Sequence, residues 1–413
     1  MKLEFLGALN CIGASAVHVN TEKISLLLDY GAKTRERPPK PPLPIKGKVD
    51  FTFLTHAHLD HSGFLPTITK KFNSFVYCTD ITMDLTELLL LDSIKISKEE
   101  NFELPFNKKD ITELKRKTVF IEYDTEYYFD NVMVKFLDAC HIPGSSQILI
   151  EFKNKKILYT GDFNTIETRL IKAKKVKVEN LNALIIESTY HDREHEKREK
   201  EEKRLVEIVE KTVENGGICL IPAFAVGRAQ EVFSILTKEK VQCPIYIDGM
   251  AKRATIIINK YKKYLKEKDI IDKALKSIEF VNKNKRKKVL KEKSCVIICG
   301  SGFLDGGMSE FYFKKIKDDE KNSVVFVGYQ VKDSKGRKVL EEKKYENEKV
   351  KAFVEKVDLS AHAGRKELLE FIKDNNPEKV FCVHGENIDS FVKELNEMGF
   401  DAINPLEEKV YSI

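Results

Sequence analysis

The chain has 413 residues, of which 42% are hydrophobic and 33% are charged, a composition typical of a globular protein with a densely charged surface. Its 71 basic and 65 acidic residues leave a formal net charge of +6, which permits a polyanionic partner without requiring one. The length allows two sizeable cores, or one core with a large insertion. No apolar run approaches a membrane span and the N-terminus lacks a signal-peptide pattern, so we expect a cytoplasmic protein with no membrane partner.

The eight cysteines also indicate a reducing compartment. They are scattered along the chain, mostly within apolar runs such as Gly217–Leu220 and Val380–Val383, and no two of them form a Cys-x-x-Cys pair. We therefore expect buried, reduced thiols rather than a disulfide framework, a zinc ribbon or a redox site.

Short apolar or alternating runs, typical of strands, recur through the first part of the chain. A helical pattern covers Ile81–Ile96, and the proline cluster Pro38–Pro44 predicts a loop. Strands are expected over Met1–Leu6, Lys23–Leu28, Phe51–Leu54, Val132–Leu137, Ser146–Phe152, Lys156–Tyr159 and Ala183–Ile186. Four of these strands end close to a residue that can bind a metal or act as an acid.

The pattern changes after Tyr190. Residues 191–203 are nearly all charged, and they predict the solvated start of a helix that continues to about Glu214. From Gly217 onward, strands alternate with glycine-containing loops and helices, and the expected strands are Ile218–Ile221, Ile245–Ile247 and Cys295–Cys299. This alternation predicts a parallel sheet covered by helices.

The segment from His56 to His61 is the first candidate metal site. It contains three histidines and one aspartate directly after a predicted strand, although taken alone it is equally a histidine-rich turn. Other potential ligands also follow strands or apolar runs, and the full set is His56, His58, Asp60, His61, His141, Asp162, Glu187, His362 and His384. Neutral imidazole and carboxylate suit zinc, and this set is large enough for two ions that share a carboxylate.

The order of these residues resembles the metallo-β-lactamase superfamily. The matching pattern is His56-x-His58-x-Asp60-His61, then His141 and Asp162, with Asp29 ahead of them. Later motifs narrow the resemblance to the β-CASP nucleases, which include ribonuclease J and the nuclease subunit of the cleavage and polyadenylation factor. These motifs are Glu187-Ser188-Thr189-Tyr190, Pro222 to Arg228, Ser301-Gly302 with Gly306-Gly307, Ser360-Ala361-His362 and Val383-His384-Gly385.

The resemblance implies an α/β fold, an αββα sandwich with an inserted β-CASP domain built on a mostly parallel sheet flanked by helices. The sandwich domain would comprise residues 1–190 and 356–413, and the β-CASP domain residues 191–355. Because the insertion returns just before His362, it would form a second wall over the metal site, and a cleft of this kind suits a polymer better than a small amide.

The resemblance further implies two Zn²⁺ ions per chain. One would be held by His56, His58 and His141, the other by Asp60, His61 and His384, with Asp162 bridging both. Asp29 would orient a ligand histidine, and Glu187 and His362 would act as a pair beside the metals. The expected catalytic residues are therefore His362, Glu187, Asp60 and Asp29.

These similarities imply a zinc-dependent ribonuclease of RNA processing or decay, which cuts single-stranded RNA internally and leaves a 3′-hydroxyl and a 5′-phosphate. His384 favours RNA, because the DNA-repair branch of the family usually has valine at that position. A 5′-to-3′ exoribonuclease is the nearest alternative. A DNA nuclease and an inactive RNA-processing scaffold are further alternatives, although every ligand position is intact.

Family resemblance assigns Arg228, Ser301 and Gly302 to substrate binding, although turn geometry alone can explain the glycine. The run Lys283–Lys293 has seven basic residues and one acidic residue, and it is equally a track for a phosphate backbone and a solvated loop. A homodimer and an RNA-processing complex are both compatible with the sequence.

Overall fold

The computed structural model describes the whole chain, residues 1–413, as two compact units. Unit 1 comprises Met1–Glu167, Ala173–Glu194 and His362–Ile413, and unit 2 comprises Thr168–Lys172 and His195–Ala361. The domain limits at residues 190 and 355 stay predictions.

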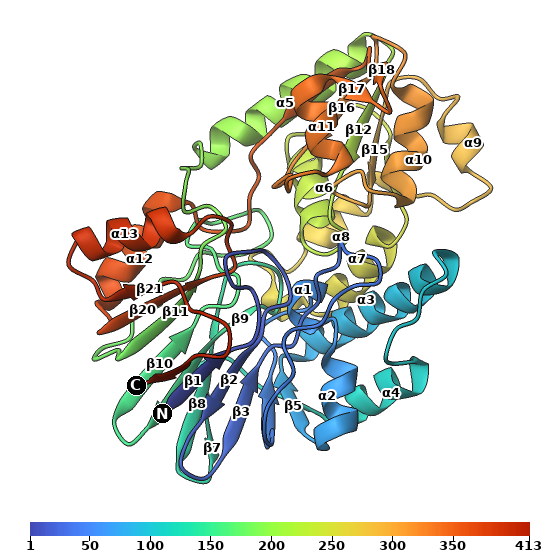
Figure 1. Ribbon diagram of the computed structural model, residues 1–413. Helices are drawn as coiled ribbons and strands as arrows, with labels where there is room; N and C mark the ends of the chain where they lie inside the picture. The colour runs from blue at the N-terminus through green and yellow to red at the C-terminus, as the bar shows by residue number, and fades with distance from the viewer. The chain divides into compact units, whose positions relative to one another are not determined.

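Two seven-stranded sheets form the centre of unit 1 (Figure 1). The first sheet has the order β22 (Val410–Ser412), β1 (Lys2–Phe5), β2 (Val17–Asn20), β3 (Ser25–Leu28), β4 (Phe51–Phe53), β5 (Phe75–Cys78) and β6 (Thr118–Phe120). The second has the order β21 (Ala402–Ile403), β20 (Lys379–Val383), β11 (Ala183–Glu187), β10 (Lys155–Tyr159), β9 (Ser146–Phe152), β8 (Val132–Asp138) and β7 (Glu126–Phe129).

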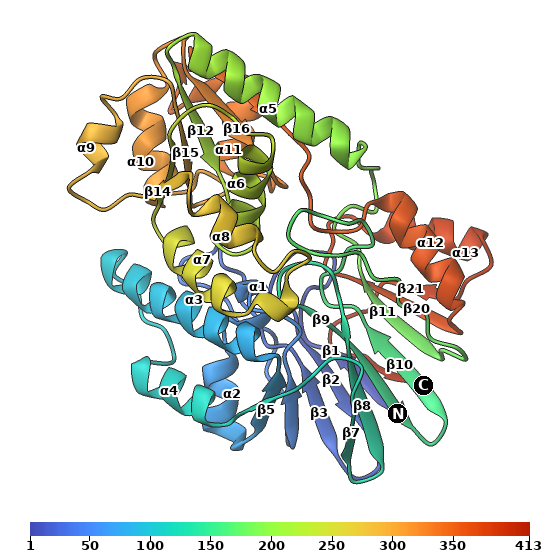
Figure 2. The same ribbon diagram turned by 180° about the vertical axis from the view of Figure 1, so that it is seen from behind.

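Helices cover the outer faces of both sheets. The helices of unit 1 are α1 (Leu59–Ser62), α2 (Leu65–Phe72), α3 (Asp80–Glu99), α4 (Lys108–Arg116), α12 (Arg365–Asn375) and α13 (Asp389–Glu397). Figures 1 and 2 show α2, α3 and α4 beside the first sheet, and α12 and α13 beside the second.

Three apolar clusters hold these four layers together. Phe53 and Phe136 belong to the cluster between the two sheets. Leu90 packs in the cluster under α2 to α4, and Leu368 and Phe391 pack in the cluster under α12 and α13. The αββα sandwich is therefore confirmed.

The register of the second sheet brings chemistry-bearing residues to one edge. Strands β10, β11 and β20 are parallel, with Tyr159 opposite Ile185 and Glu187 opposite Val383. Because parallel strands end at the same edge, the segments that follow β10 and β20 start beside Glu187. Every residue of β11 is buried, which matches its nearly continuous apolar sequence.

Unit 2 contains a six-stranded sheet in which every strand pair is parallel, so the predicted parallel sheet is confirmed. The strand order is β14 (Ile278–Phe280), β13 (Ile245–Asp248), β15 (Cys295–Cys299), β12 (Ile218–Pro222), β16 (Ser323–Phe326) and β19 (Phe353–Lys356). Its helices are α5 (Arg198–Glu214), α6 (Arg228–Lys238), α7 (Ala251–Lys260), α8 (Ile270–Ala274), α9 (Arg286–Val289), α10 (Gly307–Ile316) and α11 (Lys335–Glu342). A short 3₁₀ helix, η1 (Lys262–Tyr264), and a hairpin of β17 (Lys344–Tyr345) and β18 (Glu348–Lys349) complete it.

The charged segment at residues 191–203 differs from its prediction. The helix starts only at Arg198, and the expected solvated start is wrong for Glu201 and Glu202, which are buried. Glu202 accepts hydrogen bonds from Arg198 and Arg169 at 3.1 and 2.7 Å. Charge alone predicted solvation, whereas ion pairs with Arg198 of the same helix and with the distant Arg169 compensate the burial of Glu202.

Glu231 of α6 is the centre of the same buried network. Its carboxylate accepts hydrogen bonds from the backbone amides of Arg169 and Leu170 at 2.7 and 3.0 Å, and from Arg198 at 2.5 Å. Replacing Glu231 by alanine should lower the free energy of unfolding of unit 2 by about 3 kcal/mol, because two backbone amides lose their acceptor and the buried Arg198 guanidinium keeps only Glu202 as an ion-pair partner. Hydrogen exchange of the β12 and β15 amides measures this loss.

Glu239 provides the matched control for that substitution. It lies 3.5 Å from Arg169 but is well exposed, so its replacement by alanine should cost less than about 1 kcal/mol. Equal effects of the two substitutions would contradict a stabilising role for the buried network.

All eight cysteines are free thiols. Cys11 and Cys243 are partly exposed, and the other six are buried. Among the helices, none combines the length and the apolar character that a membrane crossing requires.

Candidate metal centre

The predicted ligands all lie in unit 1, on loops that follow its strands. His56 and His58 follow β4, and Asp60 and His61 lie on the short helix α1 directly after them. The remaining predicted ligands, His141, Asp162 and His384, follow β8, β10 and β20. Strands of both sheets therefore deliver side chains to one end of the sandwich.

His56, His58, His141 and Asp162 form the first group, with their ligand atoms within 4.8 Å of one another. The Nδ1 atom of His58 lies 3.2 Å from Nε2 of His141. Asp162 Oδ2 lies 3.5 Å from His56 Nε2 and 3.7 Å from His141 Nε2. Three imidazoles and one carboxylate oxygen thus converge on one point.

Asp60, His61, His384 and the same Asp162 form the second group, also within 4.8 Å. Asp162 turns its other oxygen, Oδ1, to this side, 3.1 Å from His61 Nε2 and 3.4 Å from His384 Nδ1. His384 Nε2 lies 3.4 Å from Asp60 Oδ2. Asp162 therefore faces both groups, one oxygen to each.

The backbone of the histidine loop packs closely against the segment after β3. A Cβ atom on Gly31 would lie 1.7 Å from the carbonyl oxygen of Asp60, so only glycine fits there. The close approach of two backbones is therefore the reason for glycine at this position.

Asp29 binds the ring nitrogen of His61 that faces away from the second group. It is fully buried, and its Oδ2 accepts hydrogen bonds from His61 Nδ1, Thr55 Oγ1 and Tyr159 OH at 2.7, 2.8 and 2.9 Å. The Thr55 amide donates to Oδ1 at 2.8 Å. A proton on Nδ1 of His61 leaves Nε2 as the acceptor that faces the second group, which is the tautomer a metal requires.

Replacing Asp29 by asparagine should weaken zinc binding about 10-fold to 100-fold, because the carboxylate no longer fixes the ring and tautomer of His61. Zinc competition with a chromogenic chelator measures the affinity. Asp50→Asn is the matched control, since Asp50 also accepts a backbone hydrogen bond, from Ser25 at 2.8 Å. Unchanged affinity in Asp29→Asn would exclude this positioning role.

The protonation states of two members of the cluster, His56 and Asp162, suit a metal. Burial and the neighbouring His61 lower the pKa of His56 well below its ordinary value, so this ring is neutral. Burial opposes ionisation of Asp162, but the positive potential of His384 and His61 prevails and lowers its pKa well below the ordinary value. Neutral imidazole and ionised carboxylate are the forms that bind zinc.

One buried nitrogen tests whether a zinc ion fits the first group. His56 Nε2 is buried and makes no hydrogen bond, a state that costs free energy unless a ligand satisfies the atom. It faces the oxygen of Asp162 at a distance longer than a hydrogen bond, 3.5 Å. The donor set and this unsatisfied atom both fit a zinc ion.

Glu187 and His362 form a pair at the edge of the cluster. Glu187 Oε1 lies 2.8 Å from His362 Nδ1, and the carboxylate also accepts hydrogen bonds from the Phe163 and Thr189 amides, each at 3.2 Å. Glu187 is buried, whereas the side chain of His362 is 19% exposed. The His362 ring lies 4.6 Å from that of His141, so a partly accessible histidine stands beside the first group.

Arg228, Ser301 and Gly302 lie in unit 2 and do not belong to the ligand groups. Arg228 is the first residue of α6, and Ser301 and Gly302 follow β15. Strands β12 and β15 pair in parallel, so the loops that follow them lie at the same edge of the sheet. At this edge the backbone amide of Ala223 donates a hydrogen bond to the carbonyl oxygen of Cys299 at 2.9 Å. Their assignment to substrate stays a prediction.

Two residues of the site were not predicted from the sequence, and three histidines lie outside the site. Thr55 and Tyr159, which bind Asp29, were not predicted, although each stands at or just after the end of a strand. The three histidines outside the site have other hydrogen-bond partners. His18 lies 2.6 Å from Ser25 Oγ, His191 lies 2.9 Å from the Glu386 carbonyl oxygen, and His195 lies 2.7 Å from Asp358.

Family models match three consecutive parts of the chain. Residues 45–213 match the metallo-beta-lactamase superfamily, residues 229–339 the Beta-Casp domain, and residues 347–405 the Zn-dependent metallo-hydrolase RNA specificity domain.

Similar proteins span nearly the whole chain. A probable RNase, MJ4 of Methanocaldococcus jannaschii, is 37% identical over 99% of this chain and 100% of its own length. RNase aCSPSF2 of Saccharolobus solfataricus is 36% identical over 98% of this chain and 83% of its own. The transcription termination factor FttA of M. jannaschii is 33% identical over 94% of this chain and 67% of its own. A crystal structure of a protein of unknown function from Enterococcus faecalis shares the fold, with a TM-score of 0.63 over 99% of both chains at 15% identity.

Proposed function

Because the chain belongs to the β-CASP family of metallo-β-lactamase-fold hydrolases, we propose that it is a zinc-dependent ribonuclease that cuts single-stranded RNA internally. The observation that carries the proposal is the pair of ligand groups that share Asp162. Two relatives that match almost the whole chain bear the name RNase, which supports RNA as the substrate.

Each group would hold one zinc ion. His56, His58 and His141 would bind the first ion, Asp60, His61 and His384 the second, and Asp162 both. Zinc in such a site makes water acidic enough to act as a nucleophile near neutral pH and withdraws charge from a phosphoryl oxygen. The buried, neutral ring of His56 and the ionised Asp162 support this assignment.

The residues beside the ligands would complete the reaction. The 3′-oxygen of ribose leaves as a strong base and needs a proton, which His362 would donate from its partly exposed ring. Glu187 accepts a hydrogen bond from Nδ1 of that ring, so Nε2 would carry the proton that is transferred. Departure of the 3′-oxygen yields a 3′-hydroxyl and a 5′-phosphate.

Digestion of RNA labelled in turn at the 5′ and 3′ ends tests the mode of cleavage. Internal fragments in both reactions support the proposed endonuclease, whereas mononucleotides released from the 5′ end identify a 5′-to-3′ exonuclease. Cleavage of DNA with no cleavage of RNA would reject the substrate assignment. Resistance of both polymers in zinc-loaded protein would indicate a scaffold.

A further inference from the structure

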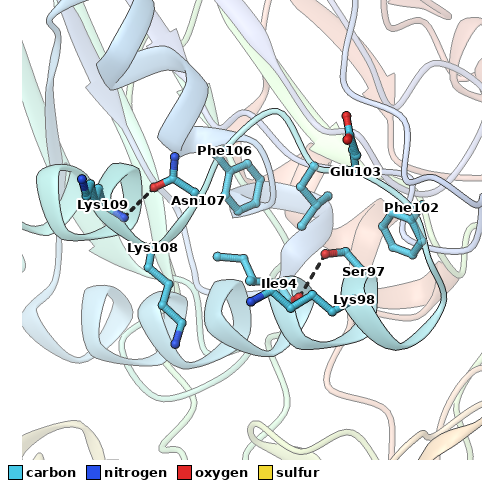
Figure 3. A pocket seen from close by; sticks show the side chains of 10 residues that line it. Ile94, Ser97, Lys98, Phe102, Glu103, Phe106, Asn107, Lys108 and Lys109 are labelled. Carbon is cyan, nitrogen blue, oxygen red and sulfur yellow. Dashed lines mark hydrogen bonds between the residues drawn. The ribbon is translucent and has the colours of Figure 1, made fainter.

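A second feature of unit 1 lies on the helical side of the first sheet. A pocket of about 470 Å³ opens between the C-terminal half of α3, the segment from Phe102 to Asn107 and the start of α4 (Figure 3). We call it the α3–α4 pocket. None of its lining residues belongs to the ligand groups, and its volume is in the range of binding sites for compact ligands or side chains.

The interior of the α3–α4 pocket is apolar. Ile94 and Phe106 are buried, and Phe102 and Leu104 are partly buried. The one hydroxyl in the lining, that of Ser97, donates to the Ile94 carbonyl at 3.0 Å, as Figure 3 shows. The buried side chains of the interior, Ile94 and Phe106, offer a nucleobase no hydrogen bond, so the interior fits an apolar side chain.

The rim of the pocket is positively charged. Lys98, Lys108 and Lys109 are exposed, and their ammonium groups form no ion pair or hydrogen bond, in contrast to the nearby Lys95, which pairs with Glu99 at 3.6 Å. Figure 3 shows Lys108 on one side of the pocket, and Phe102 on the other. Of the ten lining residues, only Glu103 is acidic. The rim therefore complements carboxylates.

The wall between Phe102 and Phe106 offers backbone groups as well. Glu103 and Leu104 lie outside any helix or strand, and neither makes a backbone hydrogen bond. An extended peptide could pair with these groups while its side chains enter the pocket. The amides at the start of α4 are less available, because Asn107 and Asp110 already form a capping box there.

We propose that the α3–α4 pocket binds a short, extended, acidic segment of a protein partner. One or two large apolar side chains of that segment would enter between Ile94 and Phe106, and its carboxylates would meet the three lysines. The apolar interior and the positive rim together favour such a peptide over RNA, whose phosphates would suit the rim but whose bases would not suit the interior.

A displayed library of random short peptides, selected on the full-length protein, tests this proposal. A triple variant, Lys98→Glu with Lys108→Glu and Lys109→Glu, serves as the counter-selection bait. We expect enrichment of peptides that combine aspartate or glutamate with large apolar residues. Their affinity, measured by fluorescence anisotropy, should fall about tenfold or more in the triple variant and in Phe102→Ala.

The matched control changes three other exposed lysines of unit 1 that have no ion pair, by the substitutions Lys2→Glu, Lys177→Glu and Lys373→Glu. It alters the net charge equally and should leave peptide affinity unchanged, and circular dichroism shows that every variant is folded. No enrichment relative to the triple variant, or equal weakening by the control, would overturn the proposal. So would an oligouridylate RNA whose binding requires the three pocket lysines while no selected peptide does.

Discussion

Replacement of Asp162 by alanine should reduce the rate of RNA hydrolysis about 10⁴-fold or more, equal to at least about 5 kcal/mol of activation free energy. Asp162 is the only residue shared by both four-residue groups, so its loss removes one ligand from each. It also removes the carboxylate that lies 3.1 Å from His61 and 3.5 Å from His56. Single-turnover cleavage of a labelled RNA measures the rate.

Two controls separate this effect from a general loss of structure. Asp124→Ala removes an exposed carboxylate of unit 1 that pairs with Lys174 and should leave the rate unchanged. Zinc content should fall in Asp162→Ala but not in Asp124→Ala. An Asp162→Ala protein that retains full zinc and full activity would show that the two groups are not the reaction centre.

Replacement of His362 by alanine should reduce the rate about 10³-fold, or by about 4 kcal/mol, because the leaving 3′-oxygen loses its proton donor. His362 belongs to neither four-residue group, so zinc content should not change. Single-turnover rates and metal analysis on the same preparation measure both quantities.

A substrate with sulfur in place of the bridging 3′-oxygen distinguishes proton donation from positioning. A thiolate leaves without protonation, so His362→Ala should cleave this substrate nearly as fast as the parent protein does. Asp162→Ala should show no such rescue. If the sulfur substrate restores nothing in His362→Ala, the histidine is not the general acid.

Much of the fold could be predicted because the local sequence pattern of many segments agrees with their burial in the folded chain. Strand β11 is apolar throughout and buried throughout, and the strand–loop–helix alternation after Gly217 produced the expected parallel sheet. The predicted ligands could be found for a related reason: histidines and aspartates that directly follow strands reach the end of a sandwich. The structure brings these residues together, and their roles as ligands stay a prediction until zinc is measured.

Residues whose roles depend on distant partners could not be predicted. Tyr159 donates a hydrogen bond to Asp29 across 130 positions of sequence, and its place at the end of a strand does not by itself reveal that partner. Glu201 and Glu202 lie in a run of charges that predicted solvent, yet partners elsewhere in unit 2 allow their burial. The lysines of the α3–α4 pocket are also ordinary in sequence, because only the fold places an apolar pocket between them.

Hydrolysis of RNA in ¹⁸O-labelled water, followed by mass spectrometry of the product ends, tests the proposed chemistry most directly. Attack by water with departure of the ribose 3′-oxygen predicts one labelled oxygen in the 5′-phosphate and an unlabelled 3′-hydroxyl. A 2′,3′-cyclic phosphate, or label in a 3′-phosphate, would contradict the account, because the 5′-oxygen would then be the leaving group.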